Sequence, residues 1–138
     1  MTSINLTREE ADQRSRMIEV HHYDVTLDLK YSDTHFLSTT KVSFTSREIG
    51  STFIDLRAEE VHEVRLNGNP LPTNSYNPTY GIPLSGLQVA DYTLEVTAKI
   101  PYSRTGEGLH RFVDPADDKV YLYTQFETAD AKRVFACF

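Results

Sequence analysis

Two polar side chains at the end of a predicted strand have the clearest potential for chemistry in this sequence. In the stretch VYLYTQFE, residues 120–127, Gln125 and Glu127 lie two positions apart. Side chains in a strand alternate between its two faces, so both are expected on the same face. A carboxylate accepts charge-assisted hydrogen bonds from an ammonium group, and a neighbouring amide carbonyl can accept another of its protons. This candidate pair could hold a cation, although the spacing alone also suits two polar residues on a solvated strand face.

The aromatic residues of the same stretch fall on both faces of the predicted strand. Tyr121 and Tyr123 share the face of the candidate pair, and Phe126 points to the opposite face. We expect the two tyrosines to pack at a surface between domains, with the lining of a binding pocket as the alternative. Phe126 is expected in the hydrophobic core.

Histidine and cysteine residues do not assemble into a metal or nucleophile motif in this chain. His62 begins HEVRL, but the zinc-protease motif H-E-x-x-H needs a second histidine where Leu66 stands. His21 and His22 are adjacent, and neighbouring side chains in a strand diverge to opposite faces. Cys137 has no local histidine to act as its base, which favours a structural thiol over a nucleophile. We therefore predict no bound metal and no catalytic residue within this sequence.

The elements that must position the candidate pair are mostly strands. Thr7 and Glu10 have the spacing of a helix capping box, so residues 1–20 are expected to form a helical arm on the surface. From His22 onward the hydrophobic period changes to two, which is typical of strands. We predict strands in segments 22–31, 36–46, 51–58, 61–69, 91–102 and 119–127, a polar loop at 103–118 and the start of a helix at 128–135.

The arrangement of these strands follows from turn chemistry and from their two unlike faces. Asn67-Gly68 is a strong hairpin signal, so the strand ending near Leu66 should pair with residues resuming near Leu71. Short alternating strands with one apolar face imply antiparallel sheets packed face to face. The predicted class is therefore all-β, with a saddle-like or β-sandwich-like domain over residues 21–138.

Composition and charge narrow the classes of partner. The 138 residues suit one domain with a single core, and the formal net charge is −6 without a basic block. Nucleic acids and anionic membranes attract clustered Lys and Arg, so neither is an expected partner. The N-terminal stretch has no signal peptide or membrane span, and one cysteine permits no internal disulfide, so a cytoplasmic location is expected. A glycosylation sequon at Asn5 has no role without secretion.

The last quarter of the chain resembles part of a known family. Residues 106–138, GEGLHRFVDPADDKVYLYTQFETADAKRVFACF, resemble the end of the N-terminal domain of M1 zinc aminopeptidases of the aminopeptidase N type. In that family a Gly-Leu-Tyr/His motif leads into a strand carrying T-Q-x-E, which is followed by an Ala/Arg-rich helix start and F-P-C-x-D-x-P. The upstream strands match in order and spacing, so the resemblance covers nearly all of residues 20–138. The matching positions are Gly108-Leu109-His110, Thr124-Gln125-Phe126-Glu127, Ala131, Lys132, Phe135 and Cys137-Phe138.

Departures from the family pattern show what this chain lacks. Lys132 stands where the family usually has Arg, and Ala136 stands where it has Pro. H-E-x-x-H, the downstream Glu ligand and G-x-M-E-N belong to the family's catalytic domain, and none occurs in this chain. The resemblance therefore implies an N-terminal domain truncated before the catalytic domain. Zn2+ would belong to the full-length parent protein, and the fragment alone would bind none and hydrolyse no peptide.

The resemblance also implies a role for the candidate pair. Glu127, with Gln125 beside it, would bind the free α-ammonium group of a peptide substrate and shape the first side-chain pocket. The catalytic domain of the same chain would then cut the first peptide bond. An alternative from another class is a stand-alone β-sandwich module that binds protein or carbohydrate without catalysis.

Overall fold

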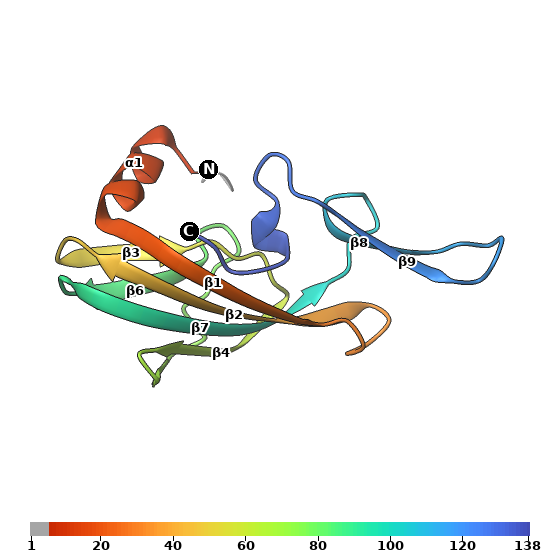
Figure 1. Cartoon of the computed structure of the whole chain (residues 1–138), viewed down its shortest axis with the longest axis horizontal. Helices are drawn as coiled ribbons and strands as arrows, with labels where there is room; N and C mark the ends of the chain where they lie inside the picture. The colour runs from red at the N-terminus through yellow and green to blue at the C-terminus, as the bar shows by residue number, and fades with distance from the viewer. Residues whose placement is uncertain (1–5) are drawn as a thin grey trace.

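A five-stranded antiparallel sheet runs through the body of the molecule. The computed structural model describes residues 6–138. The strands are β1 (Ile18–Asp28), β2 (His35–Ser46), β3 (Gly50–Ile54), β4 (Glu60–Leu66), β5 (Asn69–Leu71), β6 (Ile82–Leu87), β7 (Ala90–Pro101), β8 (Gly108–Val113) and β9 (Val120–Gln125); the helices are α1 (Arg8–Met17) and the 3-10 turn η1 (Ala131–Arg133). The large sheet has the order β1-β2-β7-β4-β5, and β3 pairs with β6 in a second sheet. β8 and β9 form a hairpin that projects from the body (Figure 1).

The core lies between the five-stranded sheet and a layer formed by β3, β6 and the C-terminal segment. Burying one large apolar side chain stabilises the fold by roughly 1.5–3 kcal/mol, so this interior dominates the favourable terms. The predicted all-β, sandwich-like class is confirmed. The most buried side chains of the core include Phe36, Val42 and Phe44 of β2, Leu94, Val96, Ala98 and Ile100 of β7, and Ile54, Leu56, Ile82, Leu84 and Leu87 of the facing layer.

The predicted hairpin at Asn67-Gly68 is confirmed. These two residues join β4 to β5, and Leu66 pairs with Asn69 across the turn. Asn67 has φ 51° and Gly68 has φ 81°, as a two-residue type I′ turn requires. The turn therefore fixes the register of this edge of the sheet.

The N-terminal helix is closed by the predicted capping box. The Glu10 amide donates to Thr7 Oγ1 at 3.1 Å, and the Thr7 amide donates to Glu10 Oε1 at 2.9 Å. The helix is anchored by a charge rather than by an apolar stripe. Arg14 is buried, and its guanidinium pairs with Asp55 at 3.0 Å while lying 4.8 Å from the centre of the Phe53 ring.

The chain turns from helix to strand earlier than the alternation of the sequence indicates. β1 begins at Ile18 rather than near His22, because the strand pairs with β2 from Ile18 opposite Ser46 onward, with a bulge after Val20. The sequon at Asn5 and the first five residues of the predicted arm lie outside the described residues. Within residues 6–138, no helix combines the length and apolar character needed to cross a membrane.

The prediction of a continuous loop at 103–118 is wrong, because β8 lies inside it. β8 pairs with β9 over six residues, from Gly108 opposite Gln125 to Val113 opposite Val120. β6 was also not predicted, since Pro83 and Gly86 interrupt its pattern. The predicted helix start near the C-terminus is confirmed as the single turn η1.

Candidate functional site

Gln125 and Glu127 lie at the base of the projecting hairpin, where the chain returns to the body of the molecule (Figure 1). Gln125 is the last residue of β9 and pairs with Gly108 at the start of β8. Glu127 lies beyond the end of the strand, so strand alternation does not position it. A hydrogen bond does so instead, because the Glu127 amide donates to Gln125 Oε1 at 2.9 Å.

The Glu127 carboxylate is free to accept a cation. Both side chains of the candidate pair are exposed. Among residues 6–138, no side chain or backbone group donates a hydrogen bond to this carboxylate or forms an ion pair with it. Gln125 Oε1 keeps a second lone pair beyond the one that accepts from the Glu127 amide. Two acceptors therefore stand two residues apart without a bound cation partner in this part of the chain.

The base of the hairpin is held against η1 by close packing. Gly108 has φ +74°, and a Cβ at this position would lie 2.9 Å from Arg133 Cβ. Glycine is therefore required both by the backbone conformation and by the approach of the arginine side chain. This contact fixes Gln125, the partner of Gly108, relative to the C-terminal segment.

One face of the hairpin carries a ladder of stacked rings that ends at Gln125. His110 stacks on Tyr123 with ring centres 4.8 Å apart, and Phe112 stacks on Tyr121 at 5.5 Å. Cross-strand pairs of this kind stabilise a two-stranded hairpin that has no core of its own. Both tyrosines remain exposed, so their packing at a surface between domains stays a prediction.

The expectation that Phe126 belongs to the core is wrong. It is 36% exposed, and its ring meets Phe135 edge to face at 6.3 Å. The strand ends at Gln125, and the chain turns away before the side chain of Phe126 reaches the interior.

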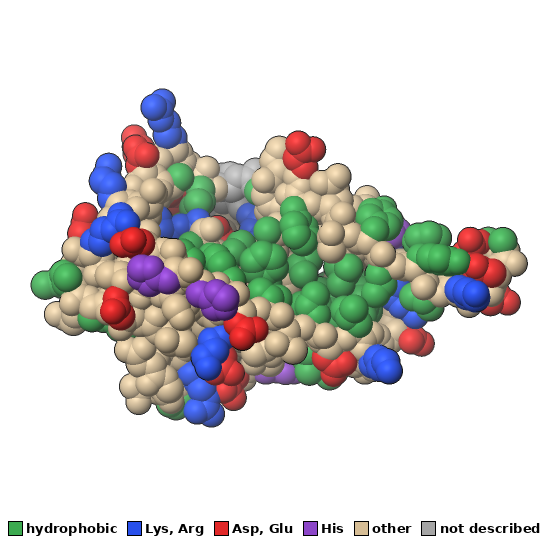
Figure 2. All heavy atoms as spheres, in the orientation of Figure 1, with side chains coloured by type: hydrophobic (Ala, Val, Ile, Leu, Met, Phe, Trp, Pro, Cys, Tyr) green, Lys and Arg blue, Asp and Glu red, His purple; other side chains and the backbone are tan. Residues whose placement is uncertain are grey.

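A broad apolar surface connects the hairpin with the body. Figure 2 shows hydrophobic side chains gathered over β1 and the C-terminal segment and continuing onto the hairpin. Monomeric soluble proteins rarely expose large contiguous apolar patches, and such patches mark interaction sites. The exposed large hydrophobic side chains of these elements are Val20, Val25, Leu29 and Tyr31 in and after β1, and Phe112, Val113, Val120, Tyr121, Leu122, Tyr123 and Phe126 on the two faces and at the end of the hairpin.

Cys137 lies in a setting that suppresses its reactivity. Its backbone forms an antiparallel bridge with Asp55, with hydrogen bonds of 2.9 and 3.0 Å. Burial, assisted by the Asp55 carboxylate, raises the pKa of the thiol to about 11. A nucleophilic cysteine needs its pKa lowered, so this thiol is structural.

We expect Cys137 to be alkylated by iodoacetamide at pH 8 at least about tenfold more slowly than a free cysteine. A thiol whose pKa is about 11 has far less thiolate than one with an unperturbed pKa, and higher intrinsic nucleophilicity offsets only part of this loss. Mass spectrometry of the folded chain, with the urea-unfolded chain as control, measures the ratio. Equal rates in the two samples would contradict the assignment. Because folding raises this pKa, the free energy of unfolding should fall as the pH rises from about 9 to about 11.

The described part of the chain contains no assembled metal site. Within residues 6–138, no three or more His, Cys, Asp or Glu side chains lie together so that they could hold an ion. His62 and Glu63 lie on β4, a strand, whereas two histidines of H-E-x-x-H must share one helix face.

The fold is that of an aminopeptidase domain. The structure of aminopeptidase A from Legionella pneumophila, solved in complex with aspartic acid, matches with a TM-score of 0.67 and 19% identity over 87% of this chain. By sequence, the whole chain is 50% identical over 141 residues to aminopeptidase N from Streptomyces lividans, and it belongs to the aminopeptidase N family. It spans 16% of that relative's length and 14% of the Legionella chain. No protein-family model matches the chain.

Proposed function

We propose that this chain is the N-terminal domain of a zinc-dependent M1 aminopeptidase, and that Gln125 and Glu127 bind the α-ammonium group of its peptide substrate. The 50% identity to an aminopeptidase N over the whole chain is the observation that carries the proposal. The unengaged carboxylate of Glu127, linked to Gln125 through its own amide, supports the binding role.

The proposed role is recognition rather than bond cleavage. A peptide α-amino group has a pKa of roughly 7.7–8.0, so most of it is cationic at neutral pH. Glu127 supplies the opposite charge, and the carbonyl of Gln125 accepts a further proton of the ammonium group. Holding the ammonium group sets the register of the peptide, so that its first peptide bond reaches the catalytic part of the protein. The side chain of Gln125 would also form part of the first side-chain pocket.

The described residues of this chain do not form a site that could hold the zinc ion. Residues 6–138 hold no cluster of metal-binding side chains, so we assign no catalytic step to them and expect the isolated chain to be inactive. Zinc, when bound in another part of the parent polypeptide, would polarise the peptide carbonyl and activate water. The expected cytoplasmic location stays part of this proposal, supported by the single cysteine.

The apolar surface suits a partner within the same polypeptide. We propose that the catalytic domain packs on the exposed side chains of β1 and the hairpin. The chain spans only 16% of the aminopeptidase N relative, so most of such a protein is available to cover this surface. The surface is continuous with the base of the hairpin, which would bring the catalytic domain beside Gln125 (Figure 2).

The proposal is tested with the complete parent polypeptide and a set of peptides that differ only at the amino terminus. Peptides with a free terminus should lose their first residue, and the same peptides after N-acetylation should not, because acetylation removes the charge that Glu127 would bind. A chelator should abolish the activity and added Zn2+ should restore it. Equal cleavage of free and acetylated peptides would overturn the amine-binding role.

A further inference from the structure

A cleft lies on the side of the molecule formed by the ends of β3 and β7. Its volume is about 490 Å³, and it is bounded by the segment after β3, the end of β7, the connection to β8 and η1. Its walls mix apolar and charged side chains, as ligand pockets commonly do. Its lining includes Arg57, Ile100, Tyr102, Ser103, Arg104 and Leu109.

Two guanidinium groups in this cleft have no counter-ion. Arg57 is half-buried and Arg104 is exposed, and neither side chain forms a hydrogen bond or ion pair with another residue of the described chain 6–138. A half-buried charge without a partner is costly, since it has lost part of its water shell without compensation. A bound anion would therefore stabilise Arg57, and Arg104 supplies a second positive charge beside the same cleft.

The other charged side chains that line the cleft have partners of their own, although Glu107 keeps its negative charge. Arg133 pairs with Asp130 at 2.8 Å, and Glu59 pairs with Lys99 at 3.7 Å. Glu107 accepts a hydrogen bond from the Thr105 hydroxyl. Neither acidic residue of the cleft, Glu59 or Glu107, forms an ion pair with Arg57 or Arg104.

A hydroxyl group adds a third donor. Ser103 Oγ accepts hydrogen bonds from the amides of Thr105 and Gly106, each at 3.2 Å. Its own proton has no acceptor within the described chain, so it remains available to a ligand.

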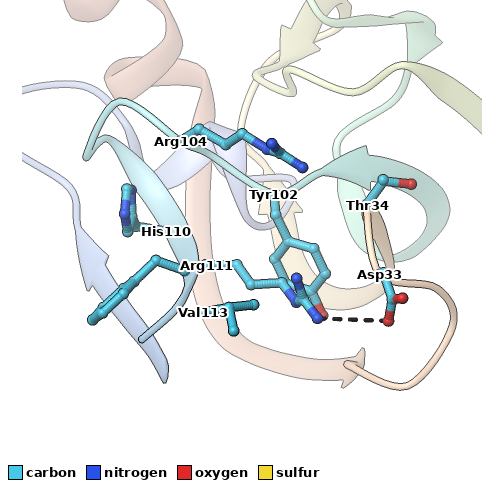
Figure 3. A pocket seen from close by; sticks show the side chains of 8 residues that line it. Asp33, Thr34, Tyr102, Arg104, His110, Arg111 and Val113 are labelled. Carbon is cyan, nitrogen blue, oxygen red and sulfur yellow. Dashed lines mark ion pairs between the residues drawn. The ribbon is translucent and has the colours of Figure 1, made fainter. Parts of the chain in front are cut away.

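The floor of the cleft is apolar and fixed. Ile100 and Leu109 are buried core residues, and Tyr102 is held because its hydroxyl donates to Leu29 O at 2.9 Å. Figure 3 shows the side chain of Arg104 reaching past Tyr102, at the boundary with the neighbouring pocket in which Arg111 pairs with Asp33. Tyr102 and Arg104 line both hollows, but the acid of the neighbouring pocket, Asp33, is paired with Arg111 and not with Arg104.

We propose that this cleft binds a small organic carboxylate with a short apolar chain. The planar guanidinium groups of Arg57 and Arg104 match the two oxygens of a carboxylate, and the floor of Ile100 and Leu109 accepts its hydrocarbon part. This site lies outside the candidate pair and does not depend on the amine-binding role proposed above. It can therefore be tested in the absence of any peptidase activity.

The direct test follows the arginine Nε–H resonances of the 15N-labelled chain while ligands are added at constant ionic strength. The probes are hexanoate, acetate, 1-hexanol and inorganic phosphate. Hexanoate should shift the Arg57 and Arg104 resonances in a saturable way and bind at least about tenfold more tightly than acetate, because the floor takes up its methylene groups. Shifts with 1-hexanol alone, or tighter binding of phosphate than of hexanoate, would overturn the proposed ligand class.

Matched variants separate the site from general charge effects. Arg57→Gln and Arg104→Gln should each weaken hexanoate binding at least about tenfold, whereas Arg16→Gln removes the same charge from the exposed face of α1 and should leave it unchanged. Arg104 is exposed, so its variant tests the proposal even if Arg57→Gln unfolds. Binding that is equally strong in Arg104→Gln and Arg16→Gln would overturn the assignment.

Discussion

Replacing Glu127 by alanine in the complete parent polypeptide should lower kcat/KM for substrates with a free amino terminus by between about 30-fold and several thousand-fold. Truncating one member of a desolvated charge pair costs roughly 2–5 kcal/mol, much of it from leaving the other charge unpaired. In a cleft closed by the catalytic domain, the substrate ammonium group would be that other charge. Steady-state hydrolysis of aminoacyl amides that release a chromophore measures the ratio.

The controls separate binding from folding. Glu127 has no hydrogen-bonding or ionic partner on its side chain in the described chain, so its removal should change the free energy of unfolding by less than about 0.5 kcal/mol. Glu127→Gln keeps the shape and loses the charge, so it should recover little activity. Glu9→Ala removes an exposed acid from α1 and should leave kcat/KM unchanged. Wild-type kcat/KM in Glu127→Ala would contradict the amine-binding role.

β7 and β9 could be predicted from the sequence, and β8 could not. β7 was predictable because its burial alternates along nearly its whole length, which forces apolar residues into every second position. β8 and β9 form a hairpin without a second layer, and all six residues of β9 are exposed. β9 was predicted from the alternation of its side chains, whereas β8 begins with Gly108 and contains Arg111, so it gave no such signal. It is a strand because it pairs with β9 over six residues and with Ser103 on its other side.

The composition of the candidate site was predictable, and its geometry was not. Alternation predicts a shared strand face for Gln125 and Glu127, but the strand stops at Gln125, and a hydrogen bond to the Glu127 amide joins the pair instead. The end of β9 depends on its partner strand, because Gln125 pairs with Gly108, the first residue of β8. Gly108 in turn packs against Arg133, and no local pattern in the sequence relates these positions. The cleft that contains Arg57 and Arg104 could not be predicted at all. These two residues are far apart in the sequence and belong to no motif, and they line one cleft only because β3 and β7 pack together.

Gly81→Ala should destabilise the chain by more than about 4 kcal/mol, which falls among the largest effects of single substitutions. Gly81 precedes β6 and has φ +77°, and a Cβ there would lie 1.9 Å from Ile54 O in the neighbouring strand β3. That atom belongs to the backbone, and Ile54 pairs with Ile82, so neither side can move without opening the small sheet. The small sheet covers the core, and its displacement would expose Ile54 and Ile82 to water.

Gly86→Ala provides the matched control for this prediction. Gly86 has φ +67°, and a Cβ there would meet nothing within 4 Å, so only the backbone conformation is penalised. That penalty is roughly 1–2 kcal/mol. Urea unfolding followed by circular dichroism should therefore give a lower midpoint for Gly86→Ala and a far lower one, or no folded protein, for Gly81→Ala. If both variants shared one midpoint, β3 could yield to an added methyl group, and the close approach of the two backbones would not constrain the packing of the small sheet.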